Sequence, residues 1–411
     1  MLFGSLKIPI DTKTMPSSII LGWMPFLIAS GMMFISLLGV LLAPLIWSSA
    51  VVLLCARMSE SERAVRWPIF QRRIQILNVI FIPLWWTLID EVMLYRAISE
   101  PLLHSYMLIL ALPPCIGIAI ARFVTGRAYS RFFARRWTVV ELLGIAASRT
   151  LSSAAPLLLF ACAIEEISQR SLLCVPLLFL CAVMAIAGRS LLRNTEGFNP
   201  QRVKGGELFK RSSVLAQRMG VQLDRIFVYA TGKGHQMNAH GGGGMIGMTD
   251  VTVHHLRGAQ LDFAICHELA HNQRKHLQKG LIFKASAFLG IAALTVFVPH
   301  RSFASRAVFN FAVIFLPLLI SYFISRYFEF EADSVAVKFT SDGESAIRAL
   351  VNLNHYTRTP FNCSKLEELF LNHPSLARRI DGIAASTKIP TERMTMIRQQ
   401  FNLDSADNTS L

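Results

Sequence analysis

The chain has 411 residues, of which 53% are hydrophobic and 16% charged, whereas a soluble globular domain carries about 25% charged residues. This balance argues against a soluble protein and predicts a membrane protein. The net charge of +15 does not predict a nucleic-acid partner, because the basic residues gather in short loops beside apolar stretches. The seven cysteines include no CxxC pair, which argues against a disulfide framework.

Seven apolar windows along the chain are long enough to cross a bilayer, which takes about 20 apolar residues in a helix. The first window, residues 19–55, is too long for one upright helix, and the N-terminus before it lacks the features of a cleaved signal. We expect it to form either a retained hairpin, giving eight spans, or one long element, giving seven. The other windows are 74–94, 103–121, 142–164, 171–188, 281–299 and 306–325.

Arginines indicate the side of the membrane on which each loop lies. The loops 56–73 and 122–137 hold five arginines each, whereas the connections 95–102 and 165–170 hold one each. Because basic residues are enriched in cytoplasmic loops, the Arg-rich loops and the polar region 189–279 are expected on the cytoplasmic side. The pattern predicts a multi-pass integral membrane protein with the lipid bilayer as a partner, and we assign it to a bacterial inner (plasma) membrane.

The polar region has secondary-structure signals of its own. Residues 205–220 have helical spacing and a glycine stop, and residues 225–230 (RIFVYA) are typical of a short strand. Residues 236–250 (QMNAHGGGGMIGMTD) predict a hairpin whose outer edge is free. Helical periodicity begins near Gln260 and continues into the window at 281–299.

The stretch Phe263–His276 reads FAICHELAHNQRKH and has the spacing of a metal site. On a helix His267 and His271 project from one face, one turn apart, so both imidazoles can bind one tetrahedral ion. Glu268 lies beside that face, where a carboxylate can take a proton from a metal-bound water and pass it to a leaving amine. An HExxH helix therefore predicts metal-assisted hydrolysis once a third ligand is found.

An acidic cluster just after the last apolar window offers that third ligand. Glu329 and Asp333 lie one helical turn apart in RYFEFEAD, and Glu331 between them is a competing candidate. If Glu329 binds the metal, Asp333 falls where it can hydrogen-bond a ligand imidazole from behind and fix its orientation. On its own such a cluster would be a solvated helix start, so the prediction depends on the HExxH helix.

These segments together resemble the M48 zinc metallopeptidases, a family that includes the membrane-embedded CAAX prenyl endopeptidases of the Ste24 type and the HtpX-type quality-control proteases. The resemblance covers residues 200–385. Its four motifs, in chain order, are Asn238-Ala239 before a glycine turn, His267-Glu-Leu-Ala-His271, Glu329-x-x-Ala-Asp333, and Asn372-His-Pro-Ser375 followed by Arg379-Ile380. The third motif favours Glu329 over Glu331 as the ligand.

The resemblance implies roles for individual residues. One zinc ion per chain would be held by His267, His271 and Glu329, with Glu268 as the general base. Other implied roles are substrate pairing along the edge strand at Asn238 and Ala239, an oxyanion or substrate contact by His373, and support or a substrate contact by Arg379. The sequence departs from the family after Asn238-Ala239, where His240 and four glycines replace a bulky residue, and this puts the substrate contacts in doubt. We expect the remaining histidines of this region to be structural or exposed, namely His235, His240, His254, His255 and His276.

The expected fold is mainly α-helical, a polytopic transmembrane bundle of seven or eight spans with a small α+β zincin-type peptidase domain. Residues 340–385 are expected to be helical and to pack over the site. The expected divisions are 1–188 for a bundle of five or six spans, 189–280 for the peptidase core, 281–325 for two spans, 326–403 for the ExxAD helix and C-terminal helices, and 404–411 for a disordered tail.

The expected function is a membrane-embedded, zinc-dependent endopeptidase that cuts membrane-associated peptides or proteins by Glu-assisted attack of zinc-bound water. Two substrate classes fit, CAAX-type processing and membrane-protein quality control. Two alternatives are an M56-type regulatory sensor-protease, which shares HExxH, and a non-catalytic membrane adaptor with a peptidase-like fold. The Asn238-Ala239 and His373-Pro374 segments favour M48 over M56, and the presence of Glu268 argues against the adaptor.

Overall fold

The computed structural model describes residues 42–401 apart from 60–62, 64, 65, 68, 72, 79, 81–99, 133–136, 169–171, 196–198, 232–236, 298–302 and 358–360. Most of the first and second apolar windows, and the expected tail at 404–411, lie outside the described residues.

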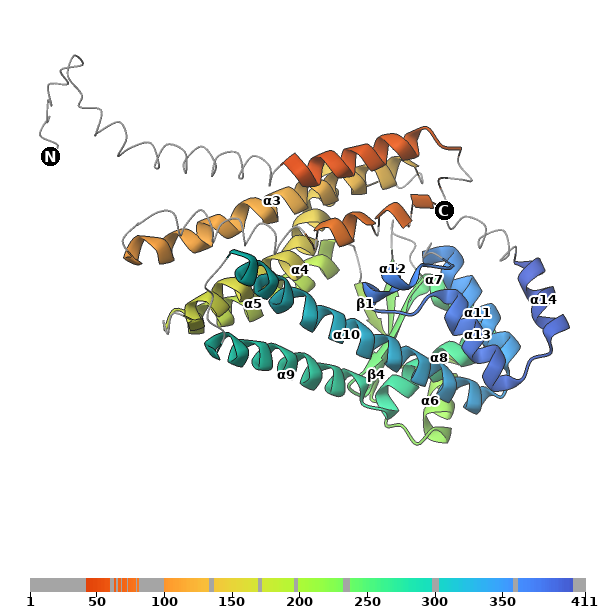
Figure 1. Ribbon diagram of the computed structural model, residues 1–411. Helices are drawn as coiled ribbons and strands as arrows, with labels where there is room; N and C mark the ends of the chain where they lie inside the picture. The colour runs from red at the N-terminus through yellow and green to blue at the C-terminus, as the bar shows by residue number, and fades with distance from the viewer. Residues whose placement is uncertain are drawn as a thin grey trace, which may run out of the picture.

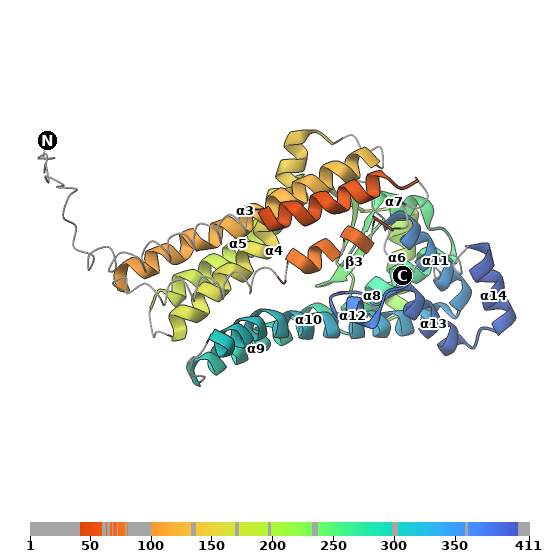
Figure 2. The same ribbon diagram turned by 45° about the horizontal axis from the view of Figure 1, so that its top comes forward.

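Long helices form one half of the molecule, and a small sheet covered by shorter helices forms the other (Figure 1). The two halves are joined by the longest helix, α10, which starts among the long helices and ends beside the sheet. Figure 2 shows α9 and α10 running side by side away from the sheet. The long helices are α3 (Glu100–Phe132), α4 (Val139–Ser168), α5 (Cys174–Thr195), α9 (His276–Phe297) and α10 (Phe303–Thr340).

One helical segment among the described residues, Val139–Phe160, is both long and apolar enough to cross a membrane. Shorter apolar helices lie at Leu42–Ala56 and Cys174–Met184. The mainly helical architecture with a small mixed sheet agrees with the expected fold. The number of spans, seven or eight, stays a prediction.

The sheet has four strands in the order β1-β2-β4-β3. β2 and β4 are parallel, and β1 and β3 join them antiparallel as the two edges. The strand predicted at 225–230 and the hairpin predicted within 236–250 are both present, whereas β1 was not predicted. The strands are β1 (Asn199–Arg202), β2 (Arg225–Ala230), β3 (Ala239–Gly242) and β4 (Met245–Thr249).

The glycine run after His240 is explained by two steric requirements. Gly243 and Gly244 have φ of 61° and 74°, as a two-residue hairpin turn between β3 and β4 requires. A Cβ at Gly241 would overlap the backbone carbonyl of Glu268, so glycine lets β3 lie directly against α8 (Ala259–Gln273). The run therefore brings the edge strand close to the HExxH helix.

The helix α8 forms the centre of the core. It packs against β3 on one side and against α10 and α11 on others, and its apolar residues are buried as expected. The predicted helical tail is also present, and α14 extends it. The remaining helices are α6 (Gly206–Arg218), α7 (Asp250–His255), α11 (Gly343–Thr357), α12 (Lys365–Leu369), α13 (Leu376–Thr387) and α14 (Thr391–Gln400).

Candidate metal centre and active site

Two helices bring three potential metal ligands together. On α8 the Nε2 atoms of His267 and His271 lie 3.2 Å apart. On α10 the carboxylate of Glu329 faces both rings, with Oε2 3.6 Å from Nε2 of His267 and Oε1 3.6 Å from Nε2 of His271. His267 and Glu329 are buried, and His271 is partly buried.

These spacings fit a tetrahedral zinc ion. A zinc ion with bonds of about 2.0–2.2 Å places neighbouring ligand atoms about 3.3–3.6 Å apart. The observed separations of 3.2, 3.6 and 3.6 Å therefore match three corners of such a tetrahedron. Two imidazoles and a carboxylate are also a donor set that zinc accepts, and the fourth corner is left for water or substrate.

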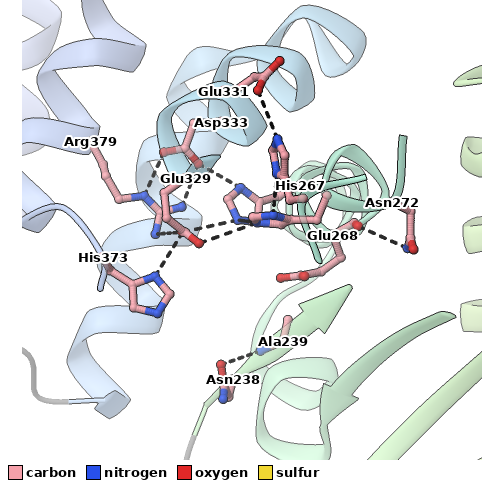
Figure 3. A network of polar contacts seen from close by, with 12 residues as sticks. Asn238, Ala239, His267, Glu268, Asn272, Glu329, Glu331, Asp333, His373 and Arg379 are labelled. Carbon is pink, nitrogen blue, oxygen red and sulfur yellow. Dashed lines mark hydrogen bonds and ion pairs between the residues drawn. The ribbon is translucent and has the colours of Figure 1, made fainter. Parts of the chain in front are cut away.

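Asp333 and Arg379 support this group from behind (Figure 3). Oδ1 of Asp333 lies 2.9 Å from Nδ1 of His267, although the two atoms are not aligned as a hydrogen bond. Arg379, from α13, donates two hydrogen bonds of 2.7 and 2.8 Å to the carboxylate of Asp333, and its Nη1 is 3.5 Å from Oε2 of Glu329. Its contacts here are with the carboxylates of the cluster.

His373 reaches the same cluster from the loop before α13. Its Nδ1 lies 3.2 Å from Oε2 of Glu329, and its side chain is 57% exposed. An exposed imidazole beside a buried carboxylate can contact both the cluster and a bound peptide. The structure thus brings His373 to the same cluster as His267, His271 and Glu329.

Glu268 and the edge strand lie on the side of His267 opposite Asp333 and Arg379 (Figure 3). The side chain of Asn238 accepts a hydrogen bond from the backbone N–H of Ala239 at 2.9 Å. The backbone N–H of Asn238 donates to the hydroxyls of Thr249 and Thr252. These bonds hold the start of β3 beside the Glu268 carboxylate.

Burial and nearby charges shift the pKa values of three residues in the cluster. Burial lowers the pKa of His267, but the carboxylates of Asp333 and Glu329 outweigh it and raise that pKa to about 10. Burial raises the pKa of Glu268 to about 7. Burial also lowers the pKa of His271 to about 3, with the charge on His267 acting in the same direction.

The carboxylates of Glu329 and Asp333 are held ionised. Burial opposes ionisation of Glu329, but His373, His267 and Arg379 together bring its pKa well below the usual value. For Asp333 the guanidinium of Arg379 overcomes the effect of burial and lowers the pKa. An anionic Glu329 facing two imidazole nitrogens is the state that a cation requires.

Glu331, the competing candidate for the third ligand, points elsewhere. It pairs with Arg274 at 3.1 Å and with Nε2 of His276 at 3.0 Å. His276 is only 4% exposed, and its Nδ1 lies 2.8 Å from Nδ1 of His271. His276 is thus a structural histidine, and it reaches the back of His271 because α8 ends at Gln273 and the chain turns at Lys275, which has φ of 54°.

Other structural residues of the site carried no recognisable sequence signal. Arg326, one turn before Glu329 on α10, is buried and donates from Nη1 to the backbone carbonyls of Glu368, Leu369 and Leu371. The Glu368 side chain accepts from the backbone N–H of Ser375. These bonds fix both ends of the loop that carries His373.

His240 lies away from the catalytic cluster. Gly241 faces α8, so the neighbouring His240 faces the other side of the sheet, because side chains alternate along a strand. There its Nε2 lies 3.1 Å from the hydroxyl of Tyr229, across Gly247. This agrees with the expected structural role.

The chain is similar to a known family over the residues that build the site. None of the curated proteins compared with the chain matches it. The crystal structure of S. mikatae Ste24p aligns with 85% of this chain and 98% of its own, at 17% identity and a TM-score of 0.42. Residues 204–387, from α6 to α13, match the family model described as Peptidase family M48. The chain thus contains a segment that matches Peptidase family M48, and this segment contains the whole cluster around His267.

Proposed function

We propose that this protein is a membrane-embedded, zinc-dependent endopeptidase that hydrolyses peptide bonds of membrane-associated substrates. The observation that carries the proposal is the convergence of His267, His271 and Glu329, with Glu268 next to His267 on the same helix. The M48 match over the same residues supports hydrolysis of peptide bonds over another metal-assisted reaction.

Each ligand is held by the fold before any ion binds. His267 and His271 are fixed by the buried helix α8, and Glu329 is fixed on α10 by its contacts with His373 and Arg379. When bound there, zinc supplies a water of near-neutral pKa and polarises the carbonyl of the substrate. The remaining chemistry comes from the side chains of the chain.

Glu268 is the proposed general base. Its pKa, raised to about 7 by burial, lies close to the pH at which a base both accepts and releases a proton efficiently. In the proposed reaction Glu268 takes the proton of the attacking water and passes it to the leaving amine. A nearby cation acts against burial and lowers this pKa, so Glu268 is ionised at neutral pH in the loaded enzyme.

The edge strand β3 is the proposed platform for the substrate. Among the strands that the structure describes, β3 is hydrogen-bonded to β4 alone, and it lies against α8, so an extended peptide can pair with its other side. Such pairing would draw the peptide past Asn238 and Ala239 toward Glu268. His373, exposed and 3.2 Å from Glu329, is placed to contact the carbonyl being attacked, and Arg379 positions the carboxylates beside it.

We place the site at the cytoplasmic surface of a bacterial inner membrane, in a protein with seven or eight spans. Large apolar side chains remain exposed along the helices that project away from the sheet, as expected of lipid-facing surfaces. They include Val140 and Leu143 on α4, Val175 and Phe179 on α5, Leu281 and Ile282 on α9, and Val308 and Phe323 on α10.

The test of this function is Glu268→Gln in detergent-solubilised protein. Gln keeps the shape of the side chain but cannot take a proton, so peptide cleavage should fall by about 10²–10⁴-fold while one zinc ion per chain is retained. Glu207→Gln, at an exposed glutamate on α6, is the matched control and should be fully active. Cleavage that persists in Glu268→Gln contradicts the mechanism, and a wild-type protein without zinc would favour the adaptor.

The substrate class needs a separate assay. A prenylated C-terminal peptide and an unfolded membrane protein should be offered to the same preparation, with Glu268→Gln as the blank. Selective cleavage of the prenylated peptide would assign CAAX-type processing, and selective cleavage of the unfolded protein would assign quality control. If neither substrate is cleaved, both substrate classes are excluded.

A further inference from the structure

The imidazole of His276 lies directly behind the proposed ligand His271. The two Nδ1 atoms are 2.8 Å apart, and Nε2 of His276 is 3.0 Å from Oε2 of Glu331. Both separations are hydrogen-bond distances. The side chain of His276 is 3% exposed, so both its polar atoms are used within the protein.

The local fold positions this ring from three directions. The left-handed conformation of Lys275 ends α8 and starts α9, which returns the chain at His276 toward His271. Phe328, from α10, stacks on the ring with centroids 4.2 Å apart and planes 6° apart. Arg274 holds Glu331 from its other oxygen at 3.1 Å. A ring that served only to fill the core would need none of the polar contacts.

We propose that His276 is a positioning residue that fixes the tautomer and orientation of His271, in a relay Glu331–His276–His271. The inference rests on the proposed function, in which Nε2 of His271 faces the metal. A neutral imidazole that binds through Nε2 carries its proton on Nδ1. The Nδ1–H of His271 donates a hydrogen bond to Nδ1 of His276. The ring of His276 then has its proton on Nε2, and this N–H donates a hydrogen bond to Glu331.

The relay gives the two ligand histidines different supports. His267 has the carboxylate of Asp333 against its Nδ1 directly, at 2.9 Å. His271 reaches the carboxylate of Glu331 only through the ring of His276. Groups behind a metal-bound histidine set its orientation and basicity, and their loss typically weakens metal binding by about 10–100-fold. His276 therefore supports His271 at Nδ1, whereas Glu329 faces the Nε2 atom of the same ring.

Two substitutions at one position separate the relay from simple packing. His276→Phe keeps an aromatic ring to stack on Phe328 but removes both polar atoms. His276→Gln has a carbonyl to accept from His271 and an amide to donate to Glu331. The relay predicts that Phe weakens zinc binding by about 10–100-fold and that Gln stays within a few-fold of wild type. Packing alone predicts that Phe is the better tolerated of the two.

The measurements are the zinc dissociation constant, by competition with a chelator, and ¹⁵N spectra of histidine-labelled protein loaded with zinc. Wild type and His276→Gln should show a protected proton on Nδ1 of His271, and His276→Phe should lose it. His254→Phe, an exposed histidine on α7, is the control for a histidine-to-phenylalanine change. Equal zinc affinity and an unchanged Nδ1 signal in His276→Phe would overturn the relay.

The outcomes distinguish this inference from the proposed function. A wild type that binds no zinc refutes the proposed function. Zinc affinity that is the same in wild type and in the variants at position 276 refutes only the relay. If His276→Phe does not fold, Glu331→Gln, which still accepts a hydrogen bond, is compared with Glu331→Met, which does not. Tighter zinc binding by Gln than by Met supports the relay, and equal, wild-type affinity in both overturns it.

Discussion

At the residue scale, the carboxylates that prepare the site for a cation also attract protons. Asp333 and Glu329 raise the pKa of His267 to about 10 in spite of its burial. Without a metal, the imidazole of His267 therefore carries protons on both ring nitrogens at neutral pH. The proton on Nε2 occupies the position that faces Glu329. A metal ion has to displace it.

This competition predicts that zinc binds more tightly as pH rises. The pKa of His267 is raised, so the ring is protonated throughout the range below it, and binding releases at least this proton. Between pH 6 and pH 8 the apparent zinc dissociation constant should fall by about tenfold per pH unit. Asp333→Asn lowers the pKa of His267 and should flatten this slope while weakening binding overall. A chelator competition series checks both, and a constant affinity across the range would contradict the assignment.

Spacing in the sequence predicts only what a regular helix determines. His267 and His271 one turn apart, and Glu329 and Asp333 one turn apart, were each recognisable because α8 and α10 are regular there. The contact of His276 with His271 was not recognisable, because the break at Lys275 involves neither glycine nor proline. Arg379 was recognised as part of the site, but its two hydrogen bonds to Asp333 depend on the packing of α13 against α10, which no local pattern encodes.

At the scale of elements, the site is built where an edge strand, two helices and a loop meet. The hairpin β3–β4 was predictable from its glycines, but the contact of Gly241 with the backbone of Glu268 was not. β1 was missed because NPQR lacks the alternation of a strand and contains Pro200, a residue that edge strands tolerate. Asn272 joins these elements, since its side chain accepts from Gly244 and donates to the carbonyl of Met245.

The loop that carries His373 gives a prediction at this scale. Arg326→Met removes the donor shared by the carbonyls of Glu368, Leu369 and Leu371, and the bond to Glu368 is buried. We expect a loss of about 1–3 kcal/mol in the free energy of unfolding. The displaced loop should lower kcat/KM by about 10–100-fold. Zinc affinity should stay unchanged, because Arg326 contacts none of the ligands in these bonds.

The measurements for Arg326→Met are denaturant unfolding, peptide cleavage and zinc titration on the same preparation. Arg225→Met, at an exposed arginine on β2, is the control for loss of a surface charge. An Arg326→Met protein that cleaves as fast as wild type would show that the position of His373 does not depend on this clamp.

At the scale of the whole molecule, the metal centre joins parts of the chain that the α9–α10 pair separates. Two ligands lie on α8, before the pair, and Glu329 lies near the end of α10, after it. The site can form only when α9 leads away from the sheet and α10 returns, as both views show (Figures 1 and 2). With 22 residues, α9 is about 33 Å long, enough to cross the hydrocarbon core.

If α9 and α10 cross the membrane, the connection between them lies on the side opposite the peptidase domain. The prediction uses single cysteines, Ser302→Cys in that connection and Ala385→Cys on α13, after replacement of the seven native cysteines by serine. In intact cells a membrane-impermeant maleimide should label Ser302→Cys, and it should label Ala385→Cys only after the membrane is permeabilised. Zinc-dependent cleavage by both variants would show that the site is intact. Labelling of both positions from the same side would mean that α9 and α10 do not span the bilayer. The exposed apolar residues Leu281, Ile282 and Phe323 would then need a protein partner in place of lipid.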